Sequence, residues 1–461
     1  MQAIKDPAGA LAAGLAAIRT QFHVPAGFPA EVLAEATAAA QRRPDDHVDR
    51  TDVAFVTLDP ASSTDLDQAF AIERAGADFV LRYAIADVGW FVADGSALDQ
   101  EAWRRGETLY LPDGRAPLYP PVLSEGAASL LPDGPKPAIV FAVRIDPDGA
   151  ARLDGAERAV VRSRAKLAYD TVGDDDLPDG FAELAERVHA AEDRRGASRV
   201  EPPEQAVSPV PGNGYTLDLR DRLDSEERNA ALSLATNLAI ADALLAAHTG
   251  LFRTMPDPDE RAVRRLRLTA TAFGVAWPDA ESLADLGRRL DGRDPKQAAL
   301  MLAIRRAGGG ASYVPYRDGE VPWHSAMAAT YAHATAPLRR LGDRYVGLAA
   351  LAVANGAPVP DTVDGAFVRL PEVMDRADDV AAGVERAVVD LAEAVVLHGS
   401  EGRTFAAVVT DVDDRGARVQ LSEVAVVGRV AAHDVQPGDA IRVRLDSADP
   451  QRRAIELTRV A

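Results

Sequence analysis

The chain has 461 residues, of which 47% are hydrophobic and 26% are charged, and its formal net charge is −20 at pH 7. This composition is typical of a globular protein with one large core and smaller satellite domains. The absence of cysteine excludes disulfides and cysteine-ligated zinc, and we expect a cytoplasmic protein. No apolar run approaches the roughly 20 residues of a membrane helix, so no membrane partner is expected. The negative charge argues against attraction of the whole surface to nucleic acid, although binding contacts are local.

Residues 1–50 predict two alanine-rich helices, at about 7–20 and 28–42, which are separated by Pro25-Ala26-Gly27. Two short helices joined in this way are compatible with a helix-turn-helix element. They are equally compatible with a helical cap on the main domain. The sequence does not decide between these two arrangements.

From Asp52 the apolar period changes to that of a strand, because Val53, Phe55 and Thr57 alternate. Further strands are predicted at 79–85 and 138–143, and a long proline-rich loop lies between those two. After about Phe181 the pattern becomes mostly helical.

Asp224 or Ser225 can cap the first long helix of this part, because short polar side chains accept hydrogen bonds from the free N–H groups of a first turn. The helix is predicted to end near Ala247. Further helices are expected at 259–274, 295–307 and 338–354.

The C-terminal segment 400–461 carries the signals of a small β-barrel. Turns rich in Asp, Gly and Pro separate five predicted strands, at 405–412, 417–421, 426–430, 440–445 and 454–457. Five short strands in such a stretch suit an OB fold. The segment has ten acidic residues and nine arginines, a net charge of −1, so it is the part of the chain that repels a polyanion least.

Three aspartates, Asp59, Asp65 and Asp67, follow the first predicted strand within one short loop. Carboxylates that lie close together raise one another's pKa, and Mg²⁺ relieves this repulsion because it prefers oxygen ligands. The alternative is a turn in which Ser and Asp side chains accept from backbone N–H groups, and the residues alone leave both readings open. A calcium EF-hand is excluded, because Ala69 stands where a third oxygen ligand should be.

A second motif runs from Tyr331 to Asp343 and contains Arg339 and Arg340. Thr335 is a natural N-cap for the helix that follows, but two arginines at a helix N-terminus oppose the helix dipole. A bound anion would resolve this conflict. The alternative is that Arg339 or Arg340 pairs with Asp343. His333, within the same motif, is expected to be a structural hydrogen-bonding residue.

Together the two motifs resemble the signatures of the ribonuclease II/ribonuclease R family, also called the RNB family. The loop resembles the metal-binding signature of four aspartates, and the arginine segment resembles Tyr-x-His-x-Thr-Ser-Pro-Ile-Arg-Arg, with Ala336 in place of serine. Gln68 replaces the fourth aspartate, and its amide can still coordinate a cation through the carbonyl oxygen. The resemblance implies a Mg²⁺ cofactor held by Asp59, Asp65, Asp67 and Gln68. It also implies that Asp65, Asp67 and Arg339 are catalytic and that Arg339 and Arg340 bind RNA.

Other positions match this family less evenly. Tyr110 resembles the tyrosine that stacks on a base near the active site, and Asn237 matches an asparagine that we expect to contact RNA. The aromatic clamp position is occupied by Val200, and Ala231 stands where an acid contacts the terminal ribose; Glu227 lies one turn away. The C-terminal segment resembles an S1-type RNA-binding domain, with RNA contacts expected from Arg403, Phe405 and Arg429.

The resemblance implies an α+β fold, in which an RNB-type catalytic domain of sheet and helices is preceded by a short helical segment and followed by an OB-fold barrel. The expected boundaries are 1–50, 51–395 and 400–461. The implied activity is Mg²⁺-dependent hydrolysis of single-stranded RNA from its 3′ end to nucleoside 5′-monophosphates, by a monomer. The alternative is a non-catalytic RNA-binding or regulatory protein, which is suggested by Gln68, Val200 and Ala231.

Overall fold

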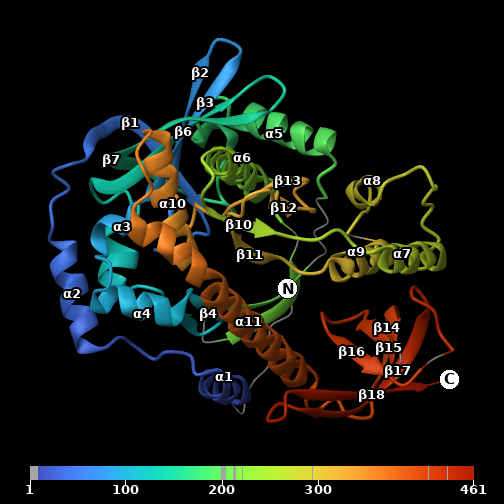
Figure 1. Ribbon diagram of the computed structural model, residues 1–461. Helices are drawn as coiled ribbons and strands as arrows, with labels where there is room; N and C mark the ends of the chain where they lie inside the picture. The colour runs from blue at the N-terminus through green and yellow to red at the C-terminus, as the bar shows by residue number, and fades with distance from the viewer. Residues whose placement is uncertain are drawn as a thin grey trace.

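The computed structural model describes residues 9–198, 204–210, 214–220, 222–292, 294–413, 415–432 and 434–460. A large body of helices and strands contains most of the chain, and a separate C-terminal barrel lies at the lower right of Figure 1. The long helix α11 (Asp361–Leu397) runs from the body to this barrel. The predicted α+β class with a C-terminal barrel is confirmed.

The body is built around a closed barrel with the strand order β1-β2-β3-β6-β7. Parallel pairing of β1 with β7 closes it, and large side chains such as Phe55, Tyr83 and Phe141 are fully buried. The sequence predicts β1, β3 and β6 but not β2 and β7. In β2 consecutive residues are buried, so apolar and polar residues do not alternate, and β7 contains many arginines, which hide the apolar pattern of a strand. The strands are β1 (Val48–Asp59), β2 (Gln68–Ala75), β3 (Asp78–Ala86), β6 (Lys136–Ile145) and β7 (Ala151–Ala168).

Three helices cover this barrel. α6 (Asp224–Ala246) packs on β6 and β7, α10 (Leu341–Ala354) packs on β7 and α6, and α5 (Phe181–Arg195) packs on α6. The helix predicted to start at Asp224 is therefore confirmed. By length and composition α6 could also cross a membrane, but buried core helices pass the same test, and more than half of its apolar window is buried inside the protein.

The two N-terminal helices pack on different parts of the body. α1 (Ala10–Gln21) lies against α11, where Gly14 meets Leu391, and α2 (Ala30–Ala40) lies against α4 (Ala97–Arg105). They therefore form a cap and not a helix-turn-helix element. Shorter elements of the body are α3 (Val88–Phe91), β4 (Leu109–Leu111), β5 (Gly114–Ala116), η1 (Leu123–Ala127), η2 (Asp174–Asp176), β8 (Glu204–Val210), β9 (Gly214–Arg220), β12 (Trp323–His324) and β13 (Ala329–Thr330).

A helical insertion separates the paired strands β10 (Leu251–Thr254) and β11 (Ser312–Pro315). It contains α7 (Glu260–Phe273), α8 (Leu283–Arg288) and α9 (Pro295–Ala307), and the helices expected at 259–274 and 295–307 are confirmed. The insertion has a hydrophobic cluster of its own, and α9 reaches the C-terminal barrel, where Arg306 pairs with Asp411 at 2.9 Å.

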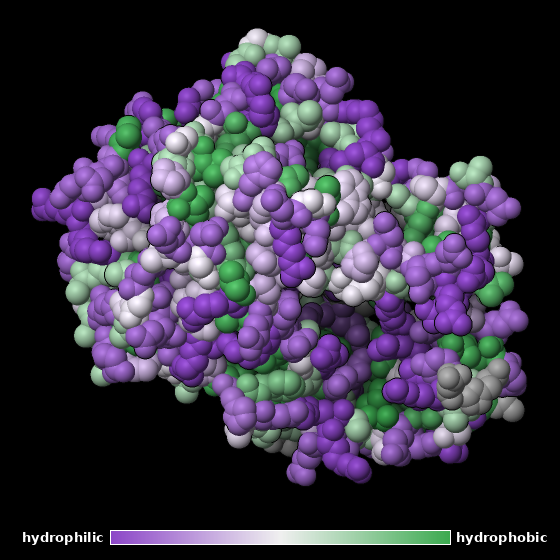
Figure 2. Space-filling view, viewed as in Figure 1, coloured by the Kyte–Doolittle hydropathy of each residue, from purple (hydrophilic) through white to green (hydrophobic). Residues whose placement is uncertain are grey.

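The C-terminal barrel closes in the order β14-β15-β16-β18-β17, and its five strands were all predicted. Its core is continuous with apolar residues of α11 and α1, so the barrel is packed firmly on the end of the body. Figure 2 shows a mostly hydrophilic face with a recess between this barrel and the body. The strands are β14 (Thr404–Asp413), β15 (Gly416–Leu421), β16 (Val427–Val430), β17 (Ala440–Asp449) and β18 (Ala454–Val460).

Candidate active site

The three aspartates lie at one end of the body's barrel, in the loop that joins β1 to β2. Asp59 is the last residue of β1, and Asp67 immediately precedes β2. Between Asp65 and Asp67, Leu66 is fully buried, and its N–H donates to the Ser129 hydroxyl at 2.9 Å. Residues two apart in an extended segment point to the same side, so both carboxylates lie on the side opposite Leu66, where Asp67 is only 5% exposed.

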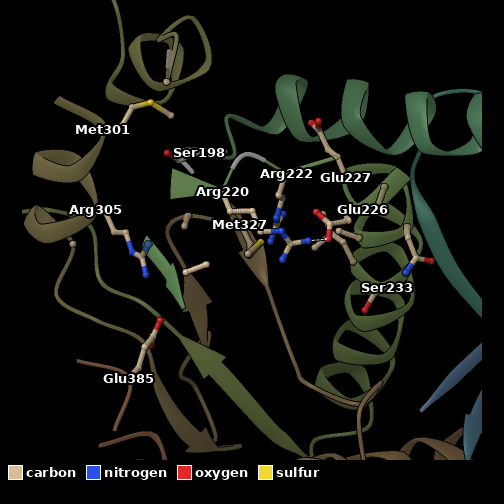
Figure 3. A pocket seen from close by; sticks show the side chains of 18 of the residues that line it. Ser198, Arg220, Arg222, Glu226, Glu227, Ser233, Met301, Arg305, Met327 and Glu385 are labelled. Carbon is tan, nitrogen blue, oxygen red and sulfur yellow. Dashed lines mark hydrogen bonds and ion pairs between the residues drawn. The ribbon is translucent and has the colours of Figure 1, made fainter. Parts of the chain in front are cut away.

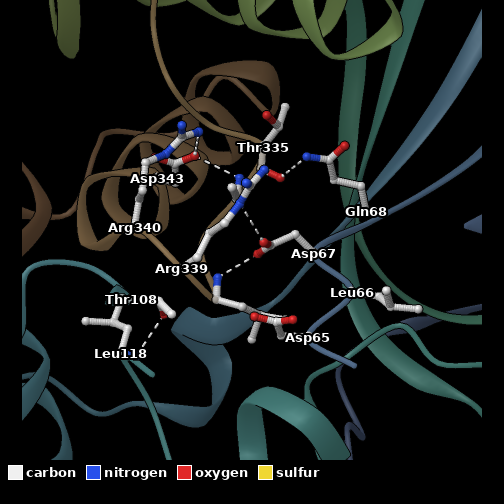
Figure 4. A network of polar contacts seen from close by, with 12 residues as sticks. Asp65, Leu66, Asp67, Gln68, Thr108, Leu118, Thr335, Arg339, Arg340 and Asp343 are labelled. Carbon is white, nitrogen blue, oxygen red and sulfur yellow. Dashed lines mark hydrogen bonds and ion pairs between the residues drawn. The ribbon is translucent and has the colours of Figure 1, made fainter. Parts of the chain in front are cut away.

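Asp67 joins the aspartate loop to the arginine segment. Its Oδ1 accepts from the Leu338 N–H at 2.6 Å, and its Oδ2 lies 3.3 Å from Arg339 Nε (Figure 4). Burial raises the pKa of the Asp67 carboxyl to about 8, although Arg339 and the Leu338 N–H both act to lower it. The two predicted motifs therefore meet at one buried carboxylate.

Asp65 is held by a short hairpin of β4 and β5. Arg115 pairs with its Oδ1, and the Tyr110 hydroxyl donates to its Oδ2 at 3.1 Å. Tyr110 and Arg115 face each other in the hairpin register, and Arg115 also pairs with Glu125 at 2.9 Å. Arg115 was missed from the sequence, where its only signal is its place directly after the turn-forming Pro112-Asp113-Gly114.

Asp59 lines the adjoining cavity, and among the residues that the structure describes no donor is bonded to its carboxylate. Burial raises the pKa of Asp59 to about 7, with Asp65 raising it further and Arg339 and Lys166 lowering it. A half-buried carboxylate without a donor, beside two others, is a donor set that suits a hard cation, so these residues fit Mg²⁺ in chemical type. Within the described ranges, no three acidic, histidine or cysteine side chains stand at metal-binding spacing.

Gln68 uses both ends of its amide within the protein. Its Nε2 donates to the Thr335 carbonyl at 2.8 Å, and its Oε1 accepts from the Tyr83 hydroxyl. Figure 4 shows the amide nitrogen of Gln68 pointing toward Thr335. Gln68 thus forms a second link between the aspartate loop and the arginine segment.

The arginine segment is a turn that precedes α10, and the expectation of a helix capped by Thr335 is wrong, because α10 begins at Leu341. Asp343, in the first turn of α10, accepts from the Ala336 N–H at 2.8 Å and from Arg340 at 3.0 and 2.8 Å. The alternative of an internal ion pair therefore holds for Arg340. The side chain of Arg339 is 46% exposed and lines the cavity.

Asn237 and His333 form hydrogen bonds that hold the arginine segment in place. Asn237 is buried, accepts from the Ala334 N–H at 3.0 Å and donates to Tyr331 and Thr335, both at 3.3 Å. His333 bonds to the Tyr313 hydroxyl at 2.8 Å, and burial lowers its pKa well below the usual value. The Asn237 amide thus bonds within the protein, and its contact to RNA remains a prediction, whereas neutral His333 has the structural role expected of it.

A cavity of about 1640 Å³ opens beside these residues. Its walls come from the aspartate loop, the β4–β5 hairpin, α6, the β8–β9 hairpin, the helical insertion and α11. Five arginines line it together with several acids, so the wall is polar but not uniformly basic. In Figure 3, Arg220 and Arg222 of one wall face Glu226 of α6, and Arg220 pairs with Glu226. Ala231 also lines this cavity, and Val200 lies outside the described residues.

One expectation for the C-terminal barrel is wrong. Phe405 is only 2% exposed because it shares the inward face of β14 with Ala407 and Val409, so it has no face for an RNA base. Arg403 and Arg429 are on the surface, where they pair with Glu423 and Asp413. Their contacts to RNA remain predictions.

Together, fold and site define an RNB-type domain followed by an S1-type barrel. A family profile described as "RNB domain" matches residues 47–353, which is more than half of the chain, and one described as "RNase II-type exonuclease C-terminal S1 domain" matches residues 403–460. The chain therefore belongs to the RNB family.

Relatives named Ribonuclease R match most of the chain. The protein of Thermotoga maritima is 28% identical over 440 residues, covering 88% of this chain and 61% of the relative. The protein of Escherichia coli is 26% identical over 501 residues, covering 95% of this chain and 59% of the relative. The chain thus spans about three fifths of the length of these two relatives.

Solved structures show the same fold. The apo form of Mycoplasma genitalium RNase R matches with a TM-score of 0.86 at 20% identity, covering 100% of this chain and 79% of that one. The same protein has been solved with ribose methylated single-stranded RNA and with double-stranded RNA. Yeast Ssd1, described as a pseudonuclease, matches with a TM-score of 0.69 at 17% identity, covering 98% of this chain and 58% of that one.

Proposed function

We propose that this chain is a hydrolytic exoribonuclease that shortens single-stranded RNA from its 3′ end, with Mg²⁺ as cofactor. The observation that carries the proposal is the meeting of the two motifs at Asp67, which joins Leu338 and Arg339 across 271 positions of sequence. The site lies beside a cavity of about 1640 Å³, into which Arg339 and Tyr110 also face. Membership of the RNB family, with relatives named Ribonuclease R, supports the same activity.

Asp59, Asp65 and Asp67 would hold the metal. When bound, Mg²⁺ supplies charge stabilisation at a phosphate and lowers the pKa of a water molecule. Its positive charge would also favour the ionised form of Asp59, whose pKa is raised first by burial and then by Asp65. Arg115, paired with Asp65, orients that carboxylate and keeps part of the site neutral before a metal binds.

Arg339 and Tyr110 would act on the RNA itself. The guanidinium of Arg339 is half exposed and lies beside Asp67, where it can donate to the charge that develops on the scissile phosphate. The ring of Tyr110 is 54% exposed, and its hydroxyl bond to Asp65 fixes the ring beside the carboxylates. A base stacked on this ring must be unpaired, because a duplex covers its base faces, and this favours a single-stranded substrate.

A second candidate function is RNA binding without cleavage. It is favoured by two local departures, Gln68 in place of a carboxylate and Ala231 in place of an acid, and by the likeness to Ssd1. Both candidates use the same cavity. They differ in whether the bound strand is shortened.

The test is an assay on 5′-labelled single-stranded RNA, with and without Mg²⁺ and in the absence of inorganic phosphate. We expect products that shorten from the 3′ end in the presence of Mg²⁺, and no shortening after EDTA. Bound but intact RNA after long incubation at high enzyme and Mg²⁺ concentrations would reject the nuclease and support the binding protein.

A further inference from the structure

Gln68 lies at the centre of a chain of hydrogen bonds beside the aspartates. The Gln68 amide nitrogen donates to the Thr335 carbonyl at 2.8 Å, and the Tyr83 hydroxyl donates to the Gln68 oxygen. The Thr335 hydroxyl in turn lies 2.9 Å from the Ser233 hydroxyl. Thr335 is therefore held through both its carbonyl and its hydroxyl.

The direction of each bond that Gln68 makes follows from the chemistry of its partner. The Thr335 carbonyl can only accept, so the Gln68 group that faces it must be the NH₂ and not the oxygen. The Gln68 oxygen is then turned to Tyr83, whose hydroxyl donates its single proton there. Tyr83 is fully buried and sits on β3, the neighbour of β2. Tyr83 and Thr335 are both buried, so breaking either of the two Gln68 bonds leaves a buried polar group without its partner.

Both residues joined by this bond, Gln68 and Thr335, lie close to the reactive residues. Thr335 is three positions before Leu338, whose N–H donates to Asp67, and four before Arg339, whose side chain faces Asp67. Gln68 is the residue directly after Asp67. The bond from Gln68 to Thr335 therefore joins the aspartate loop to the arginine turn at a second point, in addition to the bond between Leu338 and Asp67.

We propose that Gln68 is a positioning residue, which holds the turn at Thr335 so that Leu338 and Arg339 meet Asp67, and that it does not serve as a metal ligand. This inference rests on the proposed nuclease function. A carboxylate at position 68 could not donate to the Thr335 carbonyl. The amide is thus suited to the two bonds that it makes, to Thr335 and Tyr83, and the metal is left to Asp59, Asp65 and Asp67.

The test compares Gln68→Met with Tyr83→Phe in the full-length protein. Methionine has nearly the volume of glutamine but cannot donate to Thr335, and phenylalanine removes only the hydroxyl that orients the amide. For Gln68→Met we expect the single-turnover rate at saturating RNA and Mg²⁺ to fall about tenfold, the equivalent of one lost hydrogen bond. KM for RNA and the Mg²⁺ affinity, measured by calorimetry without RNA, should stay within about twofold. Tyr83→Phe should give the same pattern at smaller size, and the double variant should be no slower than Gln68→Met.

A ligand role predicts a different result. If Gln68 coordinates the metal, Gln68→Met weakens Mg²⁺ binding about tenfold or more, high Mg²⁺ restores the rate, and Tyr83→Phe has little effect; this outcome would overturn the proposal. An unchanged rate and unchanged Mg²⁺ affinity in a folded Gln68→Met protein would overturn it as well.

A readout that needs no catalysis separates this inference from the nuclease proposal. In EDTA, hydrogen exchange of the Leu338 amide should be faster in Gln68→Met than in the wild type, because the turn is no longer held against Asp67. If the wild type cleaves no RNA but this exchange difference is present, the nuclease proposal fails, and the positioning role of Gln68 is supported. Equal exchange of the Leu338 amide in the two proteins rejects the positioning role. Should Gln68→Met fail to fold, the same exchange measurement on Tyr83→Phe decides.

Discussion

Glu393 of α11 is a buried acid where the body meets the C-terminal barrel, and its replacement by glutamine should stabilise the protein at alkaline pH. The side chain is 5% exposed, and its Oε1 accepts from the Val427 N–H at 2.7 Å and from Gln205 Nε2 at 2.6 Å. Gln205 also donates to the Ala425 carbonyl at 2.8 Å. One oxygen atom thus ties α11, the β8–β9 hairpin and the barrel together.

The magnitude follows from the pKa of Glu393, which burial raises from 4.5 to about 7 against the lowering effect of its two hydrogen bonds. Nearby Asp390 raises this pKa further, and Arg418 lowers it. A raised pKa means that the folded state prefers the protonated acid, so the stabilising contribution is complete below pH 4.5 and is lost as the pH rises through 7. Above pH 7 the buried carboxylate costs about 3 kcal/mol, at about 1.4 kcal/mol for each pH unit of displacement.

Glu393→Gln keeps the accepting oxygen for both donors and removes the titration. We expect urea unfolding, followed at pH 5, 7 and 8.5, to show a variant whose advantage grows with pH and reaches up to about 3 kcal/mol. Glu456→Gln, at an exposed glutamate of the same barrel, is the matched control and should show no such trend. A difference between Glu393→Gln and wild type that does not change with pH, or a variant that is less stable at pH 8.5, would refute this reasoning.

Three further predictions concern RNA. Asp67→Asn should lower the single-turnover rate at least a hundredfold while RNA binding in EDTA persists, because the amide oxygen can still accept from Leu338 but one charge at the metal site is gone; cleavage at the wild-type rate would show that the site is misassigned. Tyr110→Ala should weaken RNA binding about tenfold, whereas Tyr110→Phe, which keeps the ring and loses only the bond to Asp65, should bind nearly as the wild type does; equal binding by all three proteins would exclude stacking. Replacing Arg403 and Arg429 together by glutamine should reduce the slope of log affinity against log salt by about 1.4, at roughly 0.7 for each phosphate contact, and an unchanged slope would remove the barrel's RNA-binding role.

The barrel variants are point substitutions because the structure rules out a clean deletion of residues 400–461. The barrel core is continuous with apolar side chains of α11, among them Val388 and Leu391, which a truncation would expose to water. Loss of RNA binding after such a deletion would therefore not distinguish lost contacts from lost folding. Substitution of the surface residues Arg403 and Arg429 tests RNA contacts of the barrel and leaves its core intact.

The sequence by itself determined the features that depend on neighbours along the chain. The five strands of the C-terminal barrel follow from local alternation and turn residues, and α6 follows from its period and its acidic first turn. The spacing of Asp59, Asp65 and Asp67, and the residues from Tyr331 to Arg340, were sufficient to suggest the RNB family. Such signals survive in a sequence because they are set by short-range geometry and side-chain chemistry.

Only the tertiary structure decided which side chains meet. Arg339 and Arg340 are adjacent and chemically identical, yet Arg340 pairs with Asp343 and Arg339 faces Asp67. The reason is that both precede the helix that begins at Leu341, and their side chains point in different directions from this turn. Pro112-Asp113-Gly114 signals the turn of the β4–β5 hairpin, but no local pattern shows that Arg115 of this hairpin meets Asp65. Pairing across 50 or 271 positions depends on how helices and barrel pack as a whole, and that packing is a property of the entire core rather than of any segment of the sequence.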